Sequence, residues 1–190
     1  MKHHISDIEA QIKSLLPISG PDWDCGPFTE EEILRVEERI GRLLEPDHRE
    51  MLLLVGGCFT FRTSVYVANY DHRVSAFMGT DPQHYSIDSE WYGYRGQIPL
   101  TWYPFANDSQ GHYFCLSGDN AVYYVFLEEE LLARNERPET SGERLADSFY
   151  EFVMSLSIPD WAQELTPDPA ALYDLRGCRV PRNKRHQDDN

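Results

Sequence analysis

Residues 28–57 read FTEEEILRVEERIGRLLEPDHREMLLLVGG, a stretch that predicts two consecutive helices with well-marked ends. Thr29 can cap a helix whose third residue is Glu32, which is the spacing of a capping box. Phe28 before the cap and Ile33 in the first turn have the spacing of a hydrophobic staple. The first helix is therefore expected to begin directly after Thr29.

The same stretch indicates which face of the first helix is buried and where the second helix stops. The apolar stripe of the first helix is expected to comprise Ile33, Val36, Ile40 and either Leu43 or Leu44. Pro46 suits the first turn of the second helix, whose residues 51–55 are strongly apolar. Gly56 and Gly57 provide its C-terminal stop, because glycine adopts the left-handed conformation without strain.

Another helix is predicted upstream of this pair. Ser6 and Glu9 have capping-box spacing, and apolar residues recur at helical intervals through Ile8, Ile12 and Leu15. Pro17 is expected to end this helix. Residues 17–27 are rich in Pro and Gly and are interpreted as a linker.

Beyond residue 57 the pattern changes to that of short strands. The segments rich in β-branched and aromatic residues are 58–62, 64–68, 100–106, 112–116 and 121–126. Residues 70–97 carry turn residues and aromatics, and we interpret them mainly as loop with one short helix or strand. Turn sequences at 107–111 and 117–120 separate the later strands, which indicates an antiparallel meander.

A last helix is predicted from Ser148, with Glu151 at capping-box distance and Pro159 as its end. Its buried face would carry Phe149, Phe152, Val153 and Leu156. The chain is thus divided into an N-terminal helix and linker at 1–27, one domain at 28–158, and a C-terminal extension at 159–190. Residues 170–175 fit one helical turn, and the polar end beyond Pro181 is expected to be disordered.

The composition excludes several classes of protein. With 41% hydrophobic and 13% aromatic residues, 190 residues are enough for a packed core. The net charge of −15 disfavours direct binding to nucleic acid and favours solubility and fast encounter with a basic partner. No apolar run approaches the roughly 18 residues of a membrane helix, and the N-terminus lacks the pattern of a signal peptide. We therefore expect a cytoplasmic protein.

No pattern typical of a metal or cofactor site is present in the sequence. The four cysteines, Cys25, Cys58, Cys115 and Cys178, form no Cys-x-x-Cys pair. The seven histidines show no metal-ligand spacing, and no Walker or Rossmann glycine pattern occurs. We expect no metal, no cofactor and reduced thiols.

An enzyme is the competing class of function. Asp71-His72 and the segment from Ser109 to His112 could contribute to a hydrolytic triad, but Ser109 lies in a polar turn and no Gly-x-Ser-x-Gly elbow is present. This alternative would be supported if Cys58, His72, His84 and His112 clustered around one pocket.

Residues 88–103 join acidic side chains to large aromatic ones, which are typical anchors of protein interfaces. The predicted partner-binding residues are Asp88, Glu90, Trp91, Tyr92, Tyr94, Trp102 and Tyr103. The carboxylates of Asp88 and Glu90 would meet basic groups while the rings fill pockets. The alternative is that these rings only cover one face of the sheet.

Four stretches in this order resemble the SUKH superfamily, which includes the Smi/Knr-type fungal cell-wall regulators and the bacterial Syd-like proteins. They are residues 28–41 with the capped helix, 45–57 with Pro46 and the Gly-Gly ending, the hairpin at 111–125, and the Ser-Phe-x-x-Phe start of the last helix at 148–153. Three positions depart from the family pattern. Glu45 replaces an apolar residue, His48 stands near a common Tyr, and Val55 replaces a common Asn.

The resemblance spans about residues 28–157 and implies an α+β fold. In that fold an antiparallel sheet packs against an N-terminal helix pair and a C-terminal helix, and a catalytic apparatus is lacking. Many bacterial members are immunity proteins that neutralise a toxin, often a nuclease or deaminase. We therefore expect an immunity protein that occludes a cognate toxin with a basic surface by stoichiometric binding. The alternative is a regulatory or scaffold protein of the Smi/Knr type, and the oligomeric state stays open.

Overall fold

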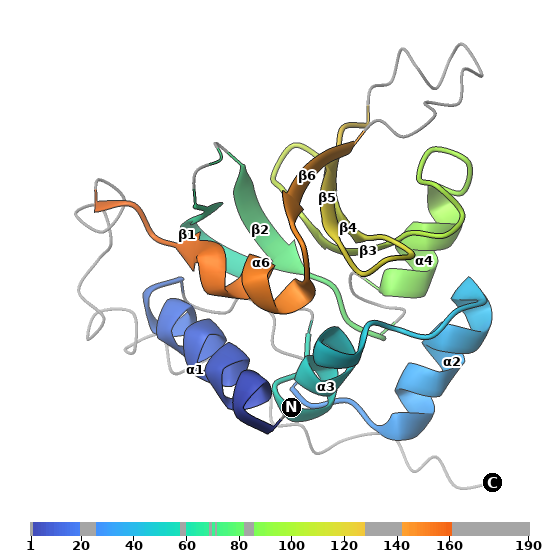
Figure 1. Cartoon of the computed structure of the whole chain (residues 1–190), viewed down its shortest axis with the longest axis horizontal. Coiled ribbons are helices and arrows are strands. Elements are labelled where there is room, and N and C mark those ends of the chain that lie inside the picture. The colour runs from blue at the N-terminus through green and yellow to red at the C-terminus, as the bar shows by residue number, and fades with distance from the viewer. Residues whose placement is uncertain are drawn as a thin grey trace, which may run out of the picture.

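The structure, a computed structural model of the whole chain, describes residues 2–19, 26–57, 60–68, 70, 72–81, 86–127 and 142–160. Its helices are α1 (Lys2–Ser19), α2 (Glu30–Ile40), α3 (Pro46–Leu54), α4 (Ile87–Gly93) and α6 (Phe149–Ser155) (Figure 1). Its strands are β1 (Thr60–Val67), β2 (Arg73–Phe77), β3 (Tyr103–Asn107), β4 (Tyr113–Leu116), β5 (Val122–Val125), β6 (Gly142–Ala146) and β7 (Leu156–Ser157). No helix in the described part of the chain is long and apolar enough to cross a membrane.

The seven described strands form one sheet in the order β6-β5-β4-β3-β2-β1-β7, and every neighbouring pair is antiparallel. Strands β1 to β6 follow one another along both the chain and the sheet, so the predicted antiparallel meander is confirmed. The α+β fold class is confirmed with it.

The sheet is strongly curled, so that the end of the β1–β2 hairpin contacts β5 and β6 across two intervening strands. The ring of His72 stacks on Tyr124 of β5 with 3.9 Å between centroids. Its Nε2 atom lies 2.8 Å from Oε2 of Glu143 in β6. The hydroxyl of Tyr70 donates to the carbonyl of Arg144 at 3.2 Å. These contacts join the two ends of the curl.

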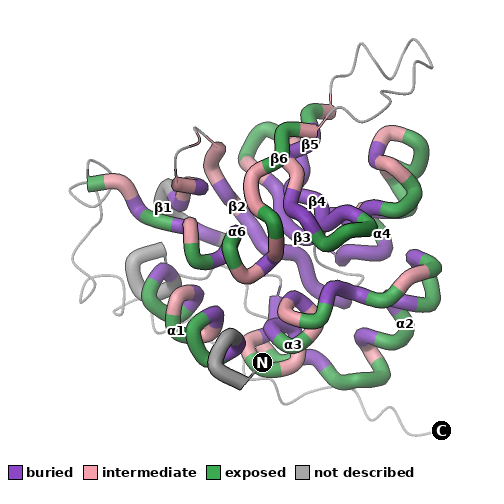
Figure 2. The backbone as a smooth tube through the Cα atoms, in the orientation of Figure 1, coloured by how far each residue is buried: buried purple, intermediate pink, exposed green. Residues whose placement is uncertain are grey.

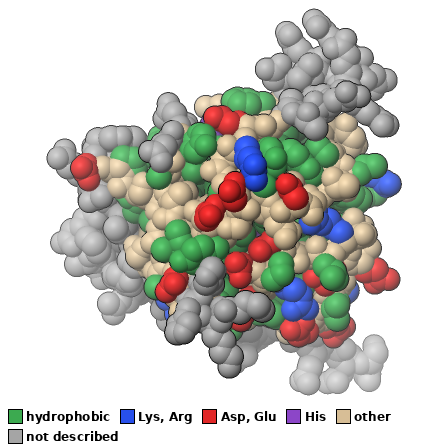
Figure 3. All heavy atoms as spheres, in the orientation of Figure 1, with side chains coloured by type: hydrophobic (Ala, Val, Ile, Leu, Met, Phe, Trp, Pro, Cys, Tyr) green, Lys and Arg blue, Asp and Glu red, His purple; other side chains and the backbone are tan. Residues whose placement is uncertain are grey.

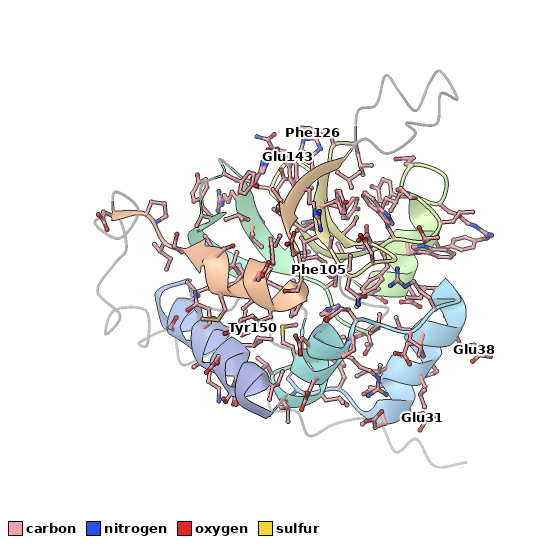
Figure 4. All side chains as sticks on the ribbon, in the orientation of Figure 1. Glu31, Glu38, Phe105, Phe126, Glu143 and Tyr150 are labelled. Atoms are coloured by element: carbon pink, nitrogen blue, oxygen red, sulfur yellow. The ribbon has the colours of Figure 1, made fainter. Side chains whose placement is uncertain are left out.

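Helices α1, α3 and α6 pack against one another, and α1 also packs against β1. Figure 2 shows their buried sides turned toward the sheet. The centre of this core is Phe105 of β3, whose ring lies 5.4 Å from Phe149 and 5.2 Å from Phe152 of α6 (Figure 4). Ile8 and Ile12 of α1 are fully buried in the same cluster. The N-terminal helix is therefore part of the packed core.

The capping signals of α2 and α3 are confirmed in detail. The N–H of Glu32 donates to Thr29 Oγ1 at 3.3 Å, and the N–H of Thr29 donates to Glu32 Oε2 at 2.8 Å. Pro46 opens α3 and Gly56 follows its end with a φ of 103°. Phe28 and Ile33 are both buried, as the staple requires. The cap of α6 is also confirmed, since the N–H of Glu151 donates to Ser148 Oγ at 3.2 Å.

Two expectations about helix ends are wrong. The first helix begins at Lys2, so Ser6 lies inside it, and it continues past Pro17 to Ser19. A proline removes one backbone donor and crowds the preceding turn, which kinks a helix without necessarily ending it. The last helix ends at Ser155 rather than at Pro159, because Leu156 turns extended and enters β7.

The strands also differ from expectation in three places. Residues 60–67 form one strand with a register irregularity between Thr60 and Val65, so a bulge replaces the expected break. The segment interpreted mainly as loop contains both β2 and α4. Strand β6 was not expected, because Glu143 and Arg144 at this sheet edge are exposed and leave no apolar alternation. The predicted turn at 170–175 and the tail beyond Pro181 lie outside the described residues.

Candidate partner-binding surface

Two tryptophans connect helix α4 to the sheet. The indole Nε1 of Trp91 donates to the carbonyl oxygen of Trp102 at 3.1 Å. The ring of Trp102 in turn stacks on Tyr123 of β5, with 4.3 Å between centroids. Both tryptophans are buried. They fix the position of α4 relative to the sheet.

A charged pair joins α4 to α2. The carboxylate of Asp88 is only 4% exposed, and its Oδ2 lies 2.5 Å from a guanidinium nitrogen of Arg39 on α2. Its other oxygen accepts a hydrogen bond from the hydroxyl of Ser86. A buried carboxylate needs such partners, because desolvation without them costs several kcal/mol. Asp88 therefore serves the packing of α4 and has no oxygen without a partner.

Glu90 of α4 and Tyr94, which follows the helix, both contact Tyr113 of the sheet. The hydroxyl of Tyr113 in β4 donates to Oε2 of Glu90 at 2.5 Å, and the rings of Tyr94 and Tyr113 lie 5.0 Å apart. Burial, followed by the hydrogen bond to Glu90, raises the pKa of Tyr113 above its ordinary value. Tyr113 is therefore a neutral donor at physiological pH.

Tyr92 differs from the other predicted contact residues because its side chain is 68% exposed. It is the one exposed residue of the seven, since Glu90 and Tyr94 are half-buried and the remaining four are buried. Tyr92 lies on a helix whose other side is fixed by Trp91, Asp88 and Glu90. The helix thus presents one rigidly mounted aromatic side chain to solvent.

Tyr103 belongs to a different part of the molecule, the corner between α2 and α3. Its hydroxyl accepts the backbone N–H of Glu45 at 3.0 Å and lies 3.1 Å from Nδ1 of His48. The guanidinium carbon of Arg42 lies 5.0 Å from the centre of its ring. Burial raises the pKa of Tyr103 above its ordinary value. Tyr103 is fully buried, so in this structure it supports the corner from within.

The departures from the family pattern at this corner have a structural explanation. Glu45 caps α3, because its Oε2 accepts the N–H of His48 at 2.9 Å. His48 has no exposed surface and its ring packs against Phe149 with 4.8 Å between centroids. Burial raises the pKa of Glu45 to about 7 and lowers the pKa of His48 to about 3. From the sequence, Glu45 and His48 were visible only as two departures from the family pattern near Pro46, and their burial was not predicted.

The structure describes His72, Ser109 and His112 among the residues considered for catalysis, and both histidines make contacts within the fold. Oδ1 of Asp108 accepts the backbone N–H groups of Gln110 and His112, which shapes the β3–β4 turn. His112 and His72 both contact the ring of Tyr124, and Nδ1 of His112 accepts the N–H of Leu127 at 3.2 Å. Ser109 is exposed in that turn.

Cys25, Cys58, Asp71, His84 and Cys178 lie outside the described residues. Cys115 is a free, buried cysteine in β4, and burial raises the pKa of its thiol. Within the described ranges no group of three or more His, Cys, Asp or Glu side chains could hold a metal ion.

Two comparisons with known proteins agree with this architecture. The chain is similar to the SPbeta prophage-derived uncharacterized protein YokK of Bacillus subtilis (strain 168). The two are 25% identical over 147 residues, which cover 67% of this chain and 74% of that protein. Residues 27–155, from just before the cap of α2 to the end of α6, match the SMI1 / KNR4 family (SUKH-1). Because this match covers more than half of the chain and includes the capped helices and most of the sheet, the chain belongs to the SMI1 / KNR4 family (SUKH-1).

Proposed function

We propose that this chain is a cytoplasmic immunity protein that binds a cognate toxin stoichiometrically and blocks access to the toxin's active site. Membership of the SUKH-1 family supports a protein-binding role. The observation that carries the proposal is the mounting of Tyr92, an exposed aromatic side chain on a helix fixed by buried contacts.

Rigid mounting favours binding because little conformational freedom is lost when the complex forms. Tyrosine and tryptophan are common hot-spot residues, and an anchor that is already ordered avoids part of the entropic cost of association. Trp91 and Trp102 are buried, so their part in this proposal is to hold α4 and Tyr92 in place, while the buried Tyr103 stabilises the α2–α3 corner. Glu90 and Tyr94 are half-buried near Tyr92 in the chain and complete the proposed contact surface.

The net charge of −15 supports rapid encounter with a toxin that carries a basic surface. Part of this charge lies on the solvent side of α2, where Glu31 and Glu38 are exposed (Figure 4), and Glu50 of α3 is exposed as well. If the toxin is a nuclease, the acidic surface would also repel and displace its nucleic-acid substrate. A long-range field of this kind accelerates association without requiring that each carboxylate touch the partner.

The test is co-expression with the toxin encoded beside this gene, followed by measurement of survival and of complex formation by size-exclusion chromatography. We expect protection and a stable complex. Tyr92→Ala should weaken binding by tenfold or more, whereas the matched change Met154→Ala, at an exposed residue of α6, should leave it unchanged.

Two results would contradict the proposal. Absence of binding and of protection would exclude an immunity role for that toxin. Binding without protection would instead favour a regulatory or scaffold protein of the Smi/Knr type, the alternative function. Charge steering is tested separately, because the association rate should fall as ionic strength rises from about 0.01 to 0.15 M.

A further inference from the structure

Several ring side chains lie together where the two ends of the curled sheet meet. The ring of His72, from the β1–β2 hairpin, stacks on Tyr124 of β5 and lies 6.3 Å from the ring of Phe126, just after that strand. His112, directly before β4, also contacts Phe126, with 4.9 Å between ring centroids. Because each ring contacts the next, these side chains form one continuous surface.

Glu143 of β6 adds a carboxylate to the same surface. Its Oε2 atom lies 2.8 Å from Nε2 of His72, which is the donor because an ionised carboxylate only accepts. The Glu143 side chain is 50% exposed, and its Oε1 atom has no hydrogen-bond or ionic partner among the described residues. Figure 4 labels Phe126 and Glu143 at the same rim of the molecule, and Figure 3 shows red and green side chains together there. We call His72, His112, Phe126 and Glu143 the seam surface.

The charge at the seam surface is negative. Arg144, the next residue of β6, points to the opposite side of the strand and pairs with Asp147 at 3.0 Å. Burial, followed by the hydrogen bond to Asp108, raises the pKa of Tyr124, and the charges of Asp108 and Glu143 raise it further. The seam surface therefore combines aromatic rings with carboxylates that lack an arginine or lysine partner in the described structure.

The exposed ring of this surface is held in place from below. Phe126 is 49% exposed, and its ring meets that of Tyr124 edge to face with 4.8 Å between centroids. Tyr124 is itself fixed, because its hydroxyl donates to Oδ2 of Asp108 at 2.6 Å. An ordered aromatic ring loses little conformational freedom when a partner binds. Phe126 thus offers a fixed ring beside the available oxygen of Glu143.

We propose that the seam surface binds an arginine side chain of a partner protein. The guanidinium group would lie against the ring of Phe126 and pair with Oε1 of Glu143. Arginine suits this place, because its planar cation is attracted to an aromatic face and hydrogen-bonds to a carboxylate. The net charge of −15 would draw a basic segment of the partner toward the chain.

This surface and helix α4 lie on opposite faces of the sheet. Tyr123 of β5 stacks on Trp102, which contacts α4, whereas the next residue, Tyr124, stacks on His72. Successive residues of a strand point to opposite faces, so the two surfaces are separate. The inference therefore goes beyond the proposed function and does not require that Tyr92 contact a partner.

The experiment uses two short synthetic peptides of equal charge as probes, one in which Arg alternates with Gly and a counterpart with Lys in place of Arg. Backbone amide shifts of the full chain are followed by NMR during titration. We expect the Arg peptide to shift the resonances of residues 72, 112, 124–127 and 143. The Lys peptide should bind there at least about twofold more weakly, because its ammonium group is compact and strongly hydrated.

Glu143→Gln and Glu50→Gln form one matched pair of variants. Both remove one exposed negative charge, and Gln at position 143 keeps an oxygen for Nε2 of His72. Glu143→Gln should weaken binding of the Arg peptide about two- to fivefold, whereas Glu50→Gln on α3 should change it less than about 1.5-fold. Thermal unfolding of each variant establishes that it is folded.

Phe126→Leu and Tyr92→Leu form the second pair, since each replaces an exposed aromatic ring by an apolar side chain without a π face. Phe126→Leu should weaken binding of the Arg peptide about two- to fivefold, which is the size of an exposed cation–π contact. Tyr92→Leu, on the other face of the sheet, should leave it unchanged.

Three results would overturn the inference. The first is that neither peptide shifts these resonances or that both bind equally tightly. The second is that the resonances shift on dilution of the chain alone, which would assign the surface to a second copy. The third is that they shift in Arg182→Gln without peptide, which would assign it to the chain's own basic C-terminal segment. Because the titration uses no toxin, its failure leaves the immunity proposal standing, and failure of toxin binding leaves the seam surface standing.

Discussion

The Nδ1 atom of His48 lies 3.1 Å from the hydroxyl oxygen of Tyr103, in a core where neither side chain reaches solvent. The same oxygen accepts the backbone N–H of Glu45, so its own hydrogen is available for Nδ1. Nδ1 is then the acceptor and Nε2 carries the ring proton, and Nε2 has no hydrogen-bond partner in the described structure. The α2–α3 corner therefore depends on a neutral histidine.

Replacing His48 by Phe should remove a source of acid sensitivity. Burial lowers the pKa of His48 to about 3 from an ordinary 6.5, so the unfolded chain binds a proton that the folded chain refuses. The stabilising effect of the neutral ring is complete above pH 6.5 and is lost as the pH falls toward 3, at up to about 1.4 kcal/mol per pH unit.

Urea unfolding of His48→Phe and the wild type at pH 7.5, 6 and 5 checks this prediction. Phe keeps the ring contacts with Phe105 and Phe149 and removes the unpaired Nε2 donor. We expect the stability of the variant relative to the wild type to rise as the pH falls. A difference that stays constant with pH would mean that His48 does not control the acid response.

Glu45 should have the opposite pH dependence. Burial raises its pKa to about 7 from 4.5, so the folded chain binds the proton more tightly than the unfolded chain. The contribution to stability is complete below pH 4.5 and is lost as the pH rises to about 7. Glu45→Gln keeps an oxygen for the N–H of His48 and removes the charge.

We therefore expect Glu45→Gln to stabilise the chain by about 1–2 kcal/mol at pH 8 and to change it little at pH 4.5. Unfolding free energies from urea titrations at the two pH values give the result. Equal effects at both values would assign the change to the cap geometry and not to the carboxylate's titration.

The helix ends show what could be predicted from the sequence and why. Thr29, Glu32, Pro46, Gly56 and Ser148 act through local backbone chemistry, and each is at the helix end that its type indicates. Such signals depend on neighbours three or four residues away, so one sequence is enough to interpret them.

Features that depend on distant residues could not be predicted from the sequence. Asp88 is a predicted partner-contact residue because it lies in an acidic and aromatic segment, and its burial could not be predicted because it depends on Arg39, far away in the chain. Helix α4 is too short for a periodic apolar pattern, and β6 is half-exposed at the sheet edge. The location of Tyr92 in an aromatic segment was visible in the sequence, but the contact of Arg39 with α4 arises only through the fold.

Arg39→Ala should destabilise the chain because it leaves the buried Asp88 without its cation. Ser86 would still donate to the carboxylate, and Arg39 is half-exposed, so the expected loss is about 1–3 kcal/mol and not the larger cost of a fully buried pair. The control is Arg144→Ala, whose pair with Asp147 is exposed on both sides and should cost less than about 0.5 kcal/mol.

Chemical denaturation of Arg39→Ala, Asp88→Asn and the double variant gives the coupling energy of the pair. We expect the double variant to recover part of the loss, since an amide at position 88 needs no counter-charge. Strict additivity of the two single changes would show that the ion pair does not hold α4 on α2.

The close approach of two chain segments at Gly56 gives the last prediction. Gly56 has a φ of 103°, and a Cβ atom added there would lie 2.0 Å from the carbonyl oxygen of Gly26. That oxygen belongs to the segment before α2, so the contact fixes the end of α3 against the start of the helix pair. Gly111 also has a positive φ, 90°, but an added Cβ would meet nothing within 4 Å.

Gly56→Ala should therefore cost more than about 3 kcal/mol, because it adds a backbone clash to the strain of a left-handed alanine. Gly111→Ala should cost about 1 kcal/mol, which is the conformational part alone. Urea unfolding measures both, and soluble yield with circular dichroism serves for Gly56→Ala if that variant does not fold. Similar losses in the two variants would mean that the chain before α2 moves away easily. In that case the contact with Gly26 would not constrain the end of α3.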